Sequence, residues 1–284
     1  MSEVLELSEM EFRLIRDFIH ERFGIYFREE KRSFMRMKLA SRVQSLRLNS
    51  FGEYLNHLKY SDPERQEVMR MVSFLTNNET YFFRELPQLF AFRDYLLPEL
   101  KKKKQAEGNK AIRILSAGCS TGEEAYTLAM LVFETGGFFW GWDVQVIGMD
   151  INWRALDQAQ RGVYFKHSFR MVDPEYIRRF FSENSGDFII KDQIRRMARF
   201  QHGNITDPST LEDLQDLDVI FCRNVLIYFS EEKIQAAIGN FHRMLRPGGH
   251  LLLGHSENIP GYFADFESRR FPETISYRKR GGTE

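Results

Sequence analysis

The feature that most constrains the fold is an alternation of strand-like and helix-like segments that begins near residue 111. Short apolar runs have the length and composition of buried strands, at residues 111–117, 144–150, 217–222 and 250–254. Helical patterns lie between them, at residues 123–134, 152–162 and 231–249, the last one ending in the turn LRPGG. Strands that alternate with helices predict an α/β domain with a doubly wound, mostly parallel sheet.

The first 85 residues predict a different unit, built from helices alone. Ser8 and Glu11 form a capping-box pattern, and Gly24 is placed to end the first helix. Further helical patterns follow, and Asp62 with Pro63 is expected to open a fourth helix. These segments predict a small helical bundle.

These patterns divide the chain into three parts. Residues 1–85 form the helical domain, and residues 111–284 form the α/β domain. Residues 86–110 are expected to be a linker helix and a solvated boundary that includes the four lysines at 101–104. The alternation breaks between Gly162 and Asn204, where strand-like pieces indicate a small insertion, expected to be antiparallel, at about residues 163–203.

The composition narrows the class of protein. Positive and negative side chains balance at 40 each, so no global basic field favours a nucleic acid partner. Two cysteines cannot complete a four-cysteine zinc site and suit a reducing compartment, so no metal is expected. The N-terminus lacks the features of a secretory signal, and no apolar run reaches about 18 residues. We therefore expect a cytoplasmic protein without direct membrane insertion.

A glycine loop, SAGCSTGEEAY at residues 116–126, follows the first predicted strand at the usual cofactor position of such sheets. It has neither the G-x-G-x-x-G fingerprint nor the lysine of a P-loop. A phosphate beside Glu123 and Glu124 would be repelled by roughly 1–4 kcal/mol, whereas the cationic S-adenosylmethionine would be favoured. Gly118 lets the backbone approach a ligand, and Asp150 ends the next strand, where an acidic residue can bind ribose hydroxyls.

Five motifs together resemble the CheR family, S-adenosylmethionine-dependent methyltransferases that esterify glutamates on chemotaxis receptors. They are LTNNETYFFRE (75–85), SAGCSTGEEAY (116–126), QRGVY (160–164), FCRNVLIYF (221–229) and GHSEN (254–258), in the family's order. The glycine loop departs from the family by having Gly118 and Cys119 where alanine is frequent. The resemblance implies an all-helical N-terminal domain, a Rossmann-like class I methyltransferase domain, and a small inserted antiparallel β-subdomain. It also implies cofactor contacts from Asn78, Thr80, Arg84, Glu124, Asp150, Asn204, Ile205, Arg223 and Asn224.

The resemblance further places Tyr228 beside the transferred methyl group. A glutamate is already ionised near neutral pH, so in-line methyl transfer to it needs no general base. We expect catalysis from alignment and from the exclusion of water. Arg84 is the candidate for steering the substrate carboxylate or holding the cofactor, because its planar guanidinium matches a carboxylate. His255 is interpreted as a buried histidine at a strand end, and Cys119 as a packing residue.

A basic segment in the helical domain gives the best indication of the substrate. Its candidate docking residues are Arg28, Arg32, Arg36, Lys38 and Arg42. The first three recur every four residues, on a helix face away from the apolar one. We expect this face to dock an acidic helix in the cytoplasmic domain of a chemotaxis receptor. The plain alternative is a solvated surface.

Two other functions stay open at this point. The enzyme could methylate another protein or a small molecule, or the chain could be a cofactor-binding signalling module that docks receptors without turnover. A monomer is expected in each case.

Overall fold

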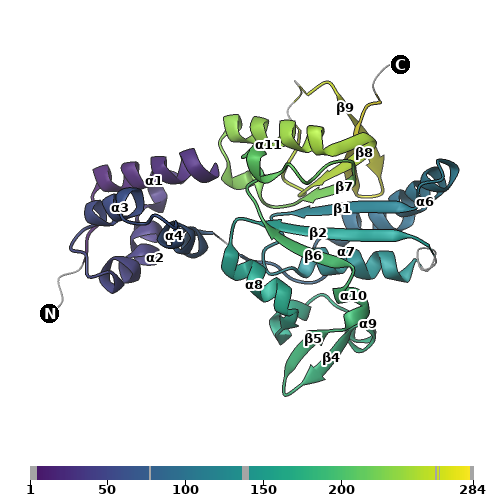
Figure 1. The fold of residues 1–284 in the computed structure, drawn as a ribbon, viewed down its shortest axis with the longest axis horizontal. Coiled ribbons are helices and arrows are strands. Elements are labelled where there is room, and N and C mark those ends of the chain that lie inside the picture. Colours follow the sequence, from purple (N-terminus) through teal and green to yellow (C-terminus); the bar gives the residue numbers. More distant parts are fainter. Residues whose placement is uncertain (1–4, 77, 136–140, 260, 262, 282–284) are drawn as a thin grey trace.

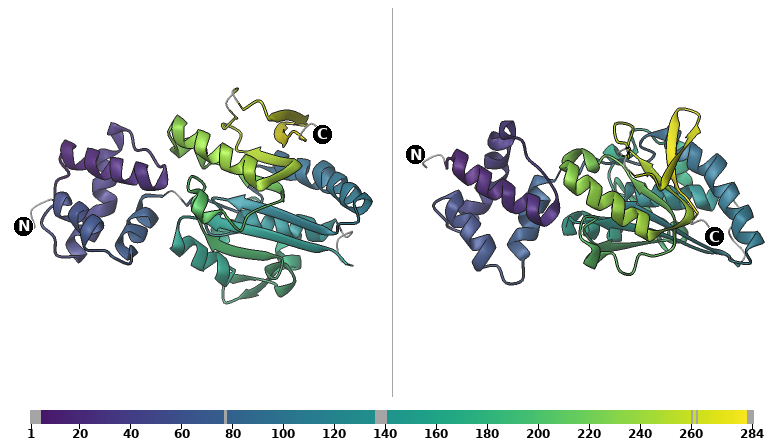
Figure 2. Two further views of the ribbon diagram at one scale, coloured as in Figure 1. Left: turned by 45° about the horizontal axis from the view of Figure 1, so that its top comes forward. Right: turned by 90° about the horizontal axis from the view of Figure 1, so that it is seen from above.

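A computed structural model describes residues 5–76, 78–135, 141–259, 261 and 263–281. The chain forms a helical N-terminal domain and a larger α/β domain, which lie side by side and are joined by an extended segment (Figure 1). Both further views show the same separation of the two parts (Figure 2). The described residues include no helix that is both long enough and apolar enough to cross a membrane.

The N-terminal domain packs its helices around one apolar core. They are α1 (Glu9–Phe23), the 3-10 turn η1 (Glu29–Lys31), α2 (Arg32–Ser45), α3 (Phe51–Tyr60) and α4 (Gln66–Leu75). The predicted capping box is present at Ser8 and Glu11, and Gly24 ends α1 with a left-handed φ of 78°. Phe12, Met35 and Tyr54, from three different helices, are fully buried in this core.

The prediction for the fourth helix is wrong at its start. Helix α4 begins at Gln66 after Arg65, which has a left-handed φ of 55°, so Asp62 and Pro63 lie in the preceding turn. The Asp62 carboxylate accepts a hydrogen bond from the Val68 backbone N–H at 2.9 Å. It therefore caps the helix across an intervening turn rather than from the adjacent position.

The α/β domain is built on a seven-stranded sheet with the order β6-β2-β1-β7-β8-β10-β9. The strands are β1 (Ala111–Ala117), β2 (Asp143–Asp150), β6 (Ala198–His202), β7 (Leu217–Cys222), β8 (Leu245–Leu253), β9 (Phe266–Phe271) and β10 (Thr274–Lys279). The first five in spatial order are parallel, and β10 is antiparallel to both neighbours. This confirms the doubly wound, mostly parallel sheet. The order reverses between β1 and β7, which is where such sheets bind ligands.

Helices cover both faces of the sheet. They are α5 (Leu86–Ala91), the π-helical turn η2 (Phe92–Leu96), α6 (Leu97–Ala106), α7 (Glu123–Glu134), α8 (Trp153–Arg161) and α11 (Glu231–Met244). Ile112 and Ile114 of β1 pack with α6 and α7, while Leu115 and Ala117 pack with α11 on the other face. Because successive side chains of a strand point to opposite faces of the sheet, β1 contributes to the apolar core on each face. The segment LRPGG lies inside β8, next to an irregularity in its pairing with β7, rather than before the strand.

Residues 86–110 contain the expected helix near Pro87, and residues 105–110 are exposed as expected, but the segment is not a linker, because its helices pack into the α/β domain. Leu97 and Leu100 of α6 belong to the main core of the α/β domain. Lys104 is buried, and its ammonium lies 3.0 Å from the Asp218 carboxylate. The sequence could not show that Lys104 faces inward, because Asp218, whose carboxylate pairs with it, is distant in the sequence.

The insertion after α8 forms a three-stranded antiparallel sheet with the order β3-β5-β4, as expected. Its elements are β3 (Val163–Tyr164), η3 (Lys166–Phe169), α9 (Pro174–Phe180), β4 (Phe181–Asn184), β5 (Asp187–Ile190) and α10 (Asp192–Arg195). The expected end near residue 203 is wrong, because β6 pairs in parallel with β2 in the main sheet. The short turns η4 (Pro208–Thr210) and η5 (Leu226–Tyr228) follow β6 and β7.

The two domains are tied together beside the C-terminal ends of the parallel strands. The Tyr26 backbone N–H donates to the Tyr228 carbonyl at 2.9 Å. The Asn204 side chain donates to the Arg22 carbonyl at 3.0 Å, and His20 Nε2 lies 2.9 Å from the Ser230 hydroxyl. These contacts hold the end of α1 against the loops that leave β6 and β7.

Candidate active site

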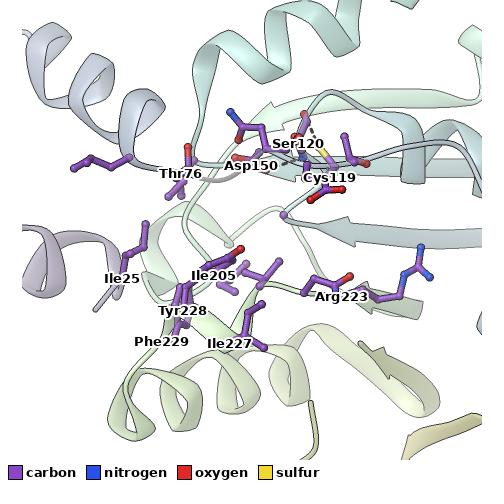
Figure 3. A pocket seen from close by; sticks show the side chains of 18 of the residues that line it. Ile25, Thr76, Cys119, Ser120, Asp150, Ile205, Arg223, Ile227, Tyr228 and Phe229 are labelled. Carbon is purple, nitrogen blue, oxygen red and sulfur yellow. Dashed lines mark hydrogen bonds between the residues drawn. The ribbon is translucent and has the colours of Figure 1, made fainter. Parts of the chain in front are cut away.

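A cavity of about 790 Å³ lies between the N-terminal domain and the C-terminal ends of β1, β2, β6 and β7. Figure 3 shows Thr76 beside Asp150 and Ser120 on one side of this space, and Ile25 near Tyr228 and Phe229 on the other. The volume lies in the range of cavities that enclose a nucleoside-sized cofactor with room for a second reactant.

The glycine loop forms one wall of this cavity. Gly118 has a φ of 78°, and a Cβ there would lie 2.4 Å from the Val225 side chain. Ser120 and Gly122 also have positive φ, so the chain turns sharply before α7 begins. The Tyr164 hydroxyl, in the insertion, donates to the Thr121 carbonyl at 2.8 Å. The turn therefore requires glycine at position 118, because a side chain there would clash with Val225, and Tyr164 of the QRGVY motif supports the loop from the insertion.

Asp150 closes β2 at the floor of the cavity. Its two carboxylate oxygens accept backbone hydrogen bonds from Ser120 at 2.7 Å and Asn152 at 2.8 Å. Burial raises the pKa of Asp150, while these N–H donors oppose that rise. The N–H groups hold the carboxylate in one orientation, and its remaining lone pairs are available for hydroxyl donors.

The structure corrects the electrostatic argument made from the two glutamates of the loop. Glu123 is 1% exposed and turned away from the cavity, where the Thr121 and Ser168 hydroxyls donate to it. Burial raises its pKa. Glu124 does line the cavity, but its carboxylate is paired with the Arg223 guanidinium at 2.6 Å. The pair of glutamates therefore does not present two free negative charges to a ligand.

Asn78, Thr80 and Arg84, from the residues that precede α5, line the cavity. Arg84 donates to the Glu79 carbonyl at 2.8 Å, and its guanidinium lies 5.8 Å from the Tyr81 ring centre. These two contacts hold the guanidinium group of Arg84 at the cavity. Asn77, in the same motif, lies outside the described residues.

The loops after β6 and β7 complete the lining with Asn204, Ile205, Arg223, Asn224 and Tyr228. The Asn204 side chain is already used, because it donates to Arg22 and accepts from Thr206. It therefore contributes to domain docking as well as to the wall. Tyr228 is 38% exposed at the cavity rim.

Every residue expected to contact the cofactor lies on this one cavity, together with Tyr228. They are Asn78, Thr80, Arg84, Gly118, Glu124, Asp150, Asn204, Ile205, Arg223 and Asn224. They come from five separate stretches of the chain, so only the fold brings them together.

The expected docking residues separate into three groups. Arg28 and Lys38 line the cavity. Arg32 and Arg36 do not, and Arg36 lies 3.7 Å from the Glu6 carboxylate. Arg42 is removed from the docking set, because its guanidinium bonds both oxygens of the buried Glu67 at 2.9 and 2.6 Å. The regular stripe also fails at its start, since α2 begins at Arg32 and Arg28 precedes the 3-10 turn.

Comparison with known protein families covers both domains. The family model described as "CheR methyltransferase, all-alpha domain" matches residues 10–76, and "CheR methyltransferase, SAM binding domain" matches residues 78–275. The chain belongs to the CheR methyltransferase family. It is accordingly an S-adenosylmethionine-dependent methyltransferase, with the all-helical and class I methyltransferase domains that the motifs implied.

Curated relatives match over nearly the whole chain. "Chemotaxis protein methyltransferase 2" of Vibrio cholerae serotype O1 is 32% identical over 98% of this chain and 96% of its own length. "Chemotaxis protein methyltransferase" of Escherichia coli strain K12 is 34% identical over 91% of this chain and 88% of its own. The protein of that name from Borreliella burgdorferi is 33% identical over 88% of each chain.

Cys119 and His255 were not expected to take part in catalysis, and the structure agrees with the interpretation of only one of them. Cys119 is buried, and burial raises its pKa well above the usual range, which agrees with a packing role. The interpretation of His255 as a buried histidine is wrong. Its side chain is 75% exposed, and Nδ1 lies 3.1 Å from the Glu85 carboxylate.

Sequence reasoning missed the aromatic residues that the N-terminal domain contributes to the cavity wall. Tyr26, Phe27 and Phe34 line it, and the Lys31 and Lys38 ammonium groups lie 5.9 and 5.6 Å from the Phe34 ring centre. The available signal was the apolar run IYF directly after Gly24, which has no helix of its own to explain it.

Proposed function

We propose that this enzyme transfers the methyl group of S-adenosylmethionine to glutamate side-chain carboxylates in the cytoplasmic domains of chemotaxis receptors. We further propose that it acts as a monomer in the cytoplasm and needs no metal. Membership of the CheR family and relatives named as chemotaxis methyltransferases support this function. The observation that carries it is the single cavity in which the family motifs and the cations of the N-terminal domain meet.

The lining residues fit the cofactor class. The backbone at Gly118 can approach a ligand closely, Asp150 offers a fixed carboxylate to hydroxyl groups, and Ile205 and Met149 provide apolar contact. When bound, S-adenosylmethionine supplies a methyl group on a positively charged sulfur, which a carboxylate can take by in-line displacement. Arg84 and Asn224 lie at the same cavity and would help to hold it.

The rest of the proposed chemistry is recognition and alignment. A glutamate acceptor is ionised near neutral pH, so the site needs no proton acceptor. Arg28, Lys31 and Lys38 place positive charge on the wall of the cavity that Arg84 also lines, and this charge would draw an acidic segment towards the opening. Tyr228, whose carbonyl accepts from the Tyr26 N–H, would contact the acceptor or the methyl group. Well-oriented reactants can gain roughly 7–11 kcal/mol in this way.

The test is incubation with S-adenosylmethionine labelled in its methyl group and a receptor cytoplasmic fragment. Label that mild base releases as methanol is the expected result, because methyl esters hydrolyse and methylated amines do not. Base-stable label would assign the enzyme to another acceptor group. Cofactor binding without any transfer would instead indicate a docking module.

A further inference from the structure

The loop that carries Arg223, Asn224 and Tyr228 has an unusual backbone. It leaves β7 at Cys222, passes through Asn224 with a left-handed φ of 59°, and forms the short turn η5. Asparagine adopts this region more readily than most residues, but the conformation still needs support from its surroundings. Figure 3 shows Arg223 and Tyr228 at opposite ends of this loop along the cavity.

One carboxylate satisfies most of the backbone donors in this loop. Glu257 Oε2 accepts from the Asn224 N–H at 2.9 Å, and Oε1 accepts from the Val225 N–H at 2.9 Å and the Ile227 N–H at 3.3 Å. Oε2 also accepts from the Gly254 N–H at 2.7 Å, at the end of β8. A Cβ on Gly254 would lie 2.7 Å from Glu257 Oε2, so the GHSEN motif needs its glycine for this approach.

The opposite side of the loop is fixed by the N-terminal domain. The Tyr26 N–H donates to the Tyr228 carbonyl, and Ile25 pairs with Phe229 as an isolated antiparallel bridge. The loop is therefore held between a backbone contact from one domain and a side-chain carboxylate from the other. Glu257 itself is not among the residues that line the cavity.

We propose that Glu257 is a positioning residue for methyl transfer: it sets the backbone of residues 224–227 so that Asn224 and Tyr228 meet the cofactor and the acceptor. A carboxylate suits this role because it accepts at both oxygens and donates at neither. The GHSEN motif thereby gains a function that its distance in sequence from the loop concealed. The inference rests on the proposed function for the identity of the reaction.

Two substitutions distinguish the effect of the Glu257 carboxylate from the effect of having any polar side chain at this position. In Glu257→Gln, one oxygen becomes an NH₂ group that faces backbone N–H donors, so part of the loop loses its acceptor. Glu257→Asp keeps both acceptor oxygens on a shorter stem. We expect Glu257→Gln to lower kcat on the order of 10²-fold, as a displacement of about 1 Å can do. Glu257→Asp should recover part of that loss.

The cofactor and receptor parameters should respond differently. The Kd for S-adenosylmethionine should rise in Glu257→Gln, because Asn224 moves, while the KM for the receptor fragment should stay within about twofold, because the cations of the basic segment lie on another element. Glu267→Gln is the matched control: Glu267 is an exposed carboxylate on β9, paired with Arg278, and should leave every parameter unchanged. All assays are run well below the melting temperature of each variant, measured by circular dichroism.

The inference is overturned if Glu257→Gln has the kcat and cofactor Kd of the wild type. It is also overturned if Glu257→Gln and the control Glu267→Gln change these two parameters equally. A uniform loss in both Glu257→Gln and Glu257→Asp that follows the fraction unfolded would also overturn it. The wild-type reaction is run in parallel. If the wild-type enzyme labels no receptor glutamate, the proposed function fails instead, and the two failures are distinguishable.

Discussion

Arg84 lines the cavity, which supports the proposal that it binds the acceptor carboxylate or the cofactor. Its guanidinium is held at the cavity by the Glu79 carbonyl and the Tyr81 ring, and carboxylates are recognised bidentately by such a group. We predict that Arg84→Ala lowers kcat/KM for a receptor fragment at least tenfold and that Arg84→Lys does not restore it, because lysine lacks the planar fork. Steady-state methylation assays measure this. Near-normal turnover of Arg84→Ala would remove the residue from the catalytic set.

Adjacent glutamates of the glycine loop should differ in their contribution to stability. Glu124→Gln removes a charge partner from Arg223, whose side chain is 3% exposed, and breaking such a pair costs about 3–5 kcal/mol. Glu123→Gln should cost less, because burial already favours the uncharged form of Glu123 and glutamine resembles it. Urea unfolding of both variants compares the two free energies. Equal losses would contradict the assignment of the Arg223 ion pair to Glu124 rather than to Glu123.

At the scale of elements, the structure divides the basic residues of the N-terminal domain into those that line the cavity and those that do not, and the two sets should behave differently. Reversing charge at Arg28 and Lys38, which line the cavity, should raise the receptor KM and make it less sensitive to salt, without changing the cofactor Kd. Reversal at Arg32 and Arg36, outside the cavity, is the matched pair and should have the smaller effect. If both pairs behave like wild type, the whole segment is a solvated surface.

Strand β8 contains a histidine, His250, whose protonation opposes folding. His250 Nδ1 lies 3.1 Å from the Ser276 hydroxyl, and burial, with help from Arg269 and Arg278, lowers the pKa of His250 to about 4. The unfolded chain binds this proton near pH 6.5. The stabilising contribution is therefore complete above about pH 6.5 and is lost as pH falls towards 4, at up to about 1.4 kcal/mol per pH unit.

We predict that His250→Asn, which keeps a side-chain hydrogen-bonding atom near Ser276, reduces the fall in unfolding free energy between about pH 6.5 and 4.5. Urea unfolding at several pH values gives the slope for each protein. Carboxylates also lose stabilising contacts in acid, so the difference between the two slopes is the relevant quantity. Parallel slopes would show that His250 titrates normally in the folded protein.

How far the elements could be predicted from the sequence depended on whether their signal was local. The capping box of α1 and the alternation of strands and helices are local patterns, and both were predicted correctly. The inward side of Lys104, the exposed position of His255 and the capping of α4 by Asp62 depend on partners elsewhere or on an intervening turn. The spacing of apolar residues and the residue types at turns do not indicate these contacts.

At the scale of the whole molecule, the candidate site exists only because two domains meet. The sequence motifs named most of its lining, but they could not show that Tyr26 and Phe34 form the opposite wall, or that Glu123 and Glu124 point in different directions. The first depends on domain docking through Arg22 and Asn204. The second depends on one hundred degrees of helical rotation per residue, which separates neighbours at the start of α7.

The central claim is that the cavity between the domains delivers a methyl group to a glutamate carboxylate. The most direct measurement is peptide mapping by mass spectrometry of a receptor cytoplasmic fragment, after incubation with the enzyme and S-adenosylmethionine. The account predicts the added mass of one CH₂ group on particular glutamate residues, reversed by mild base and strongly reduced with Arg84→Ala. The same added mass on lysine or arginine, or no added mass with active cofactor binding, would contradict it.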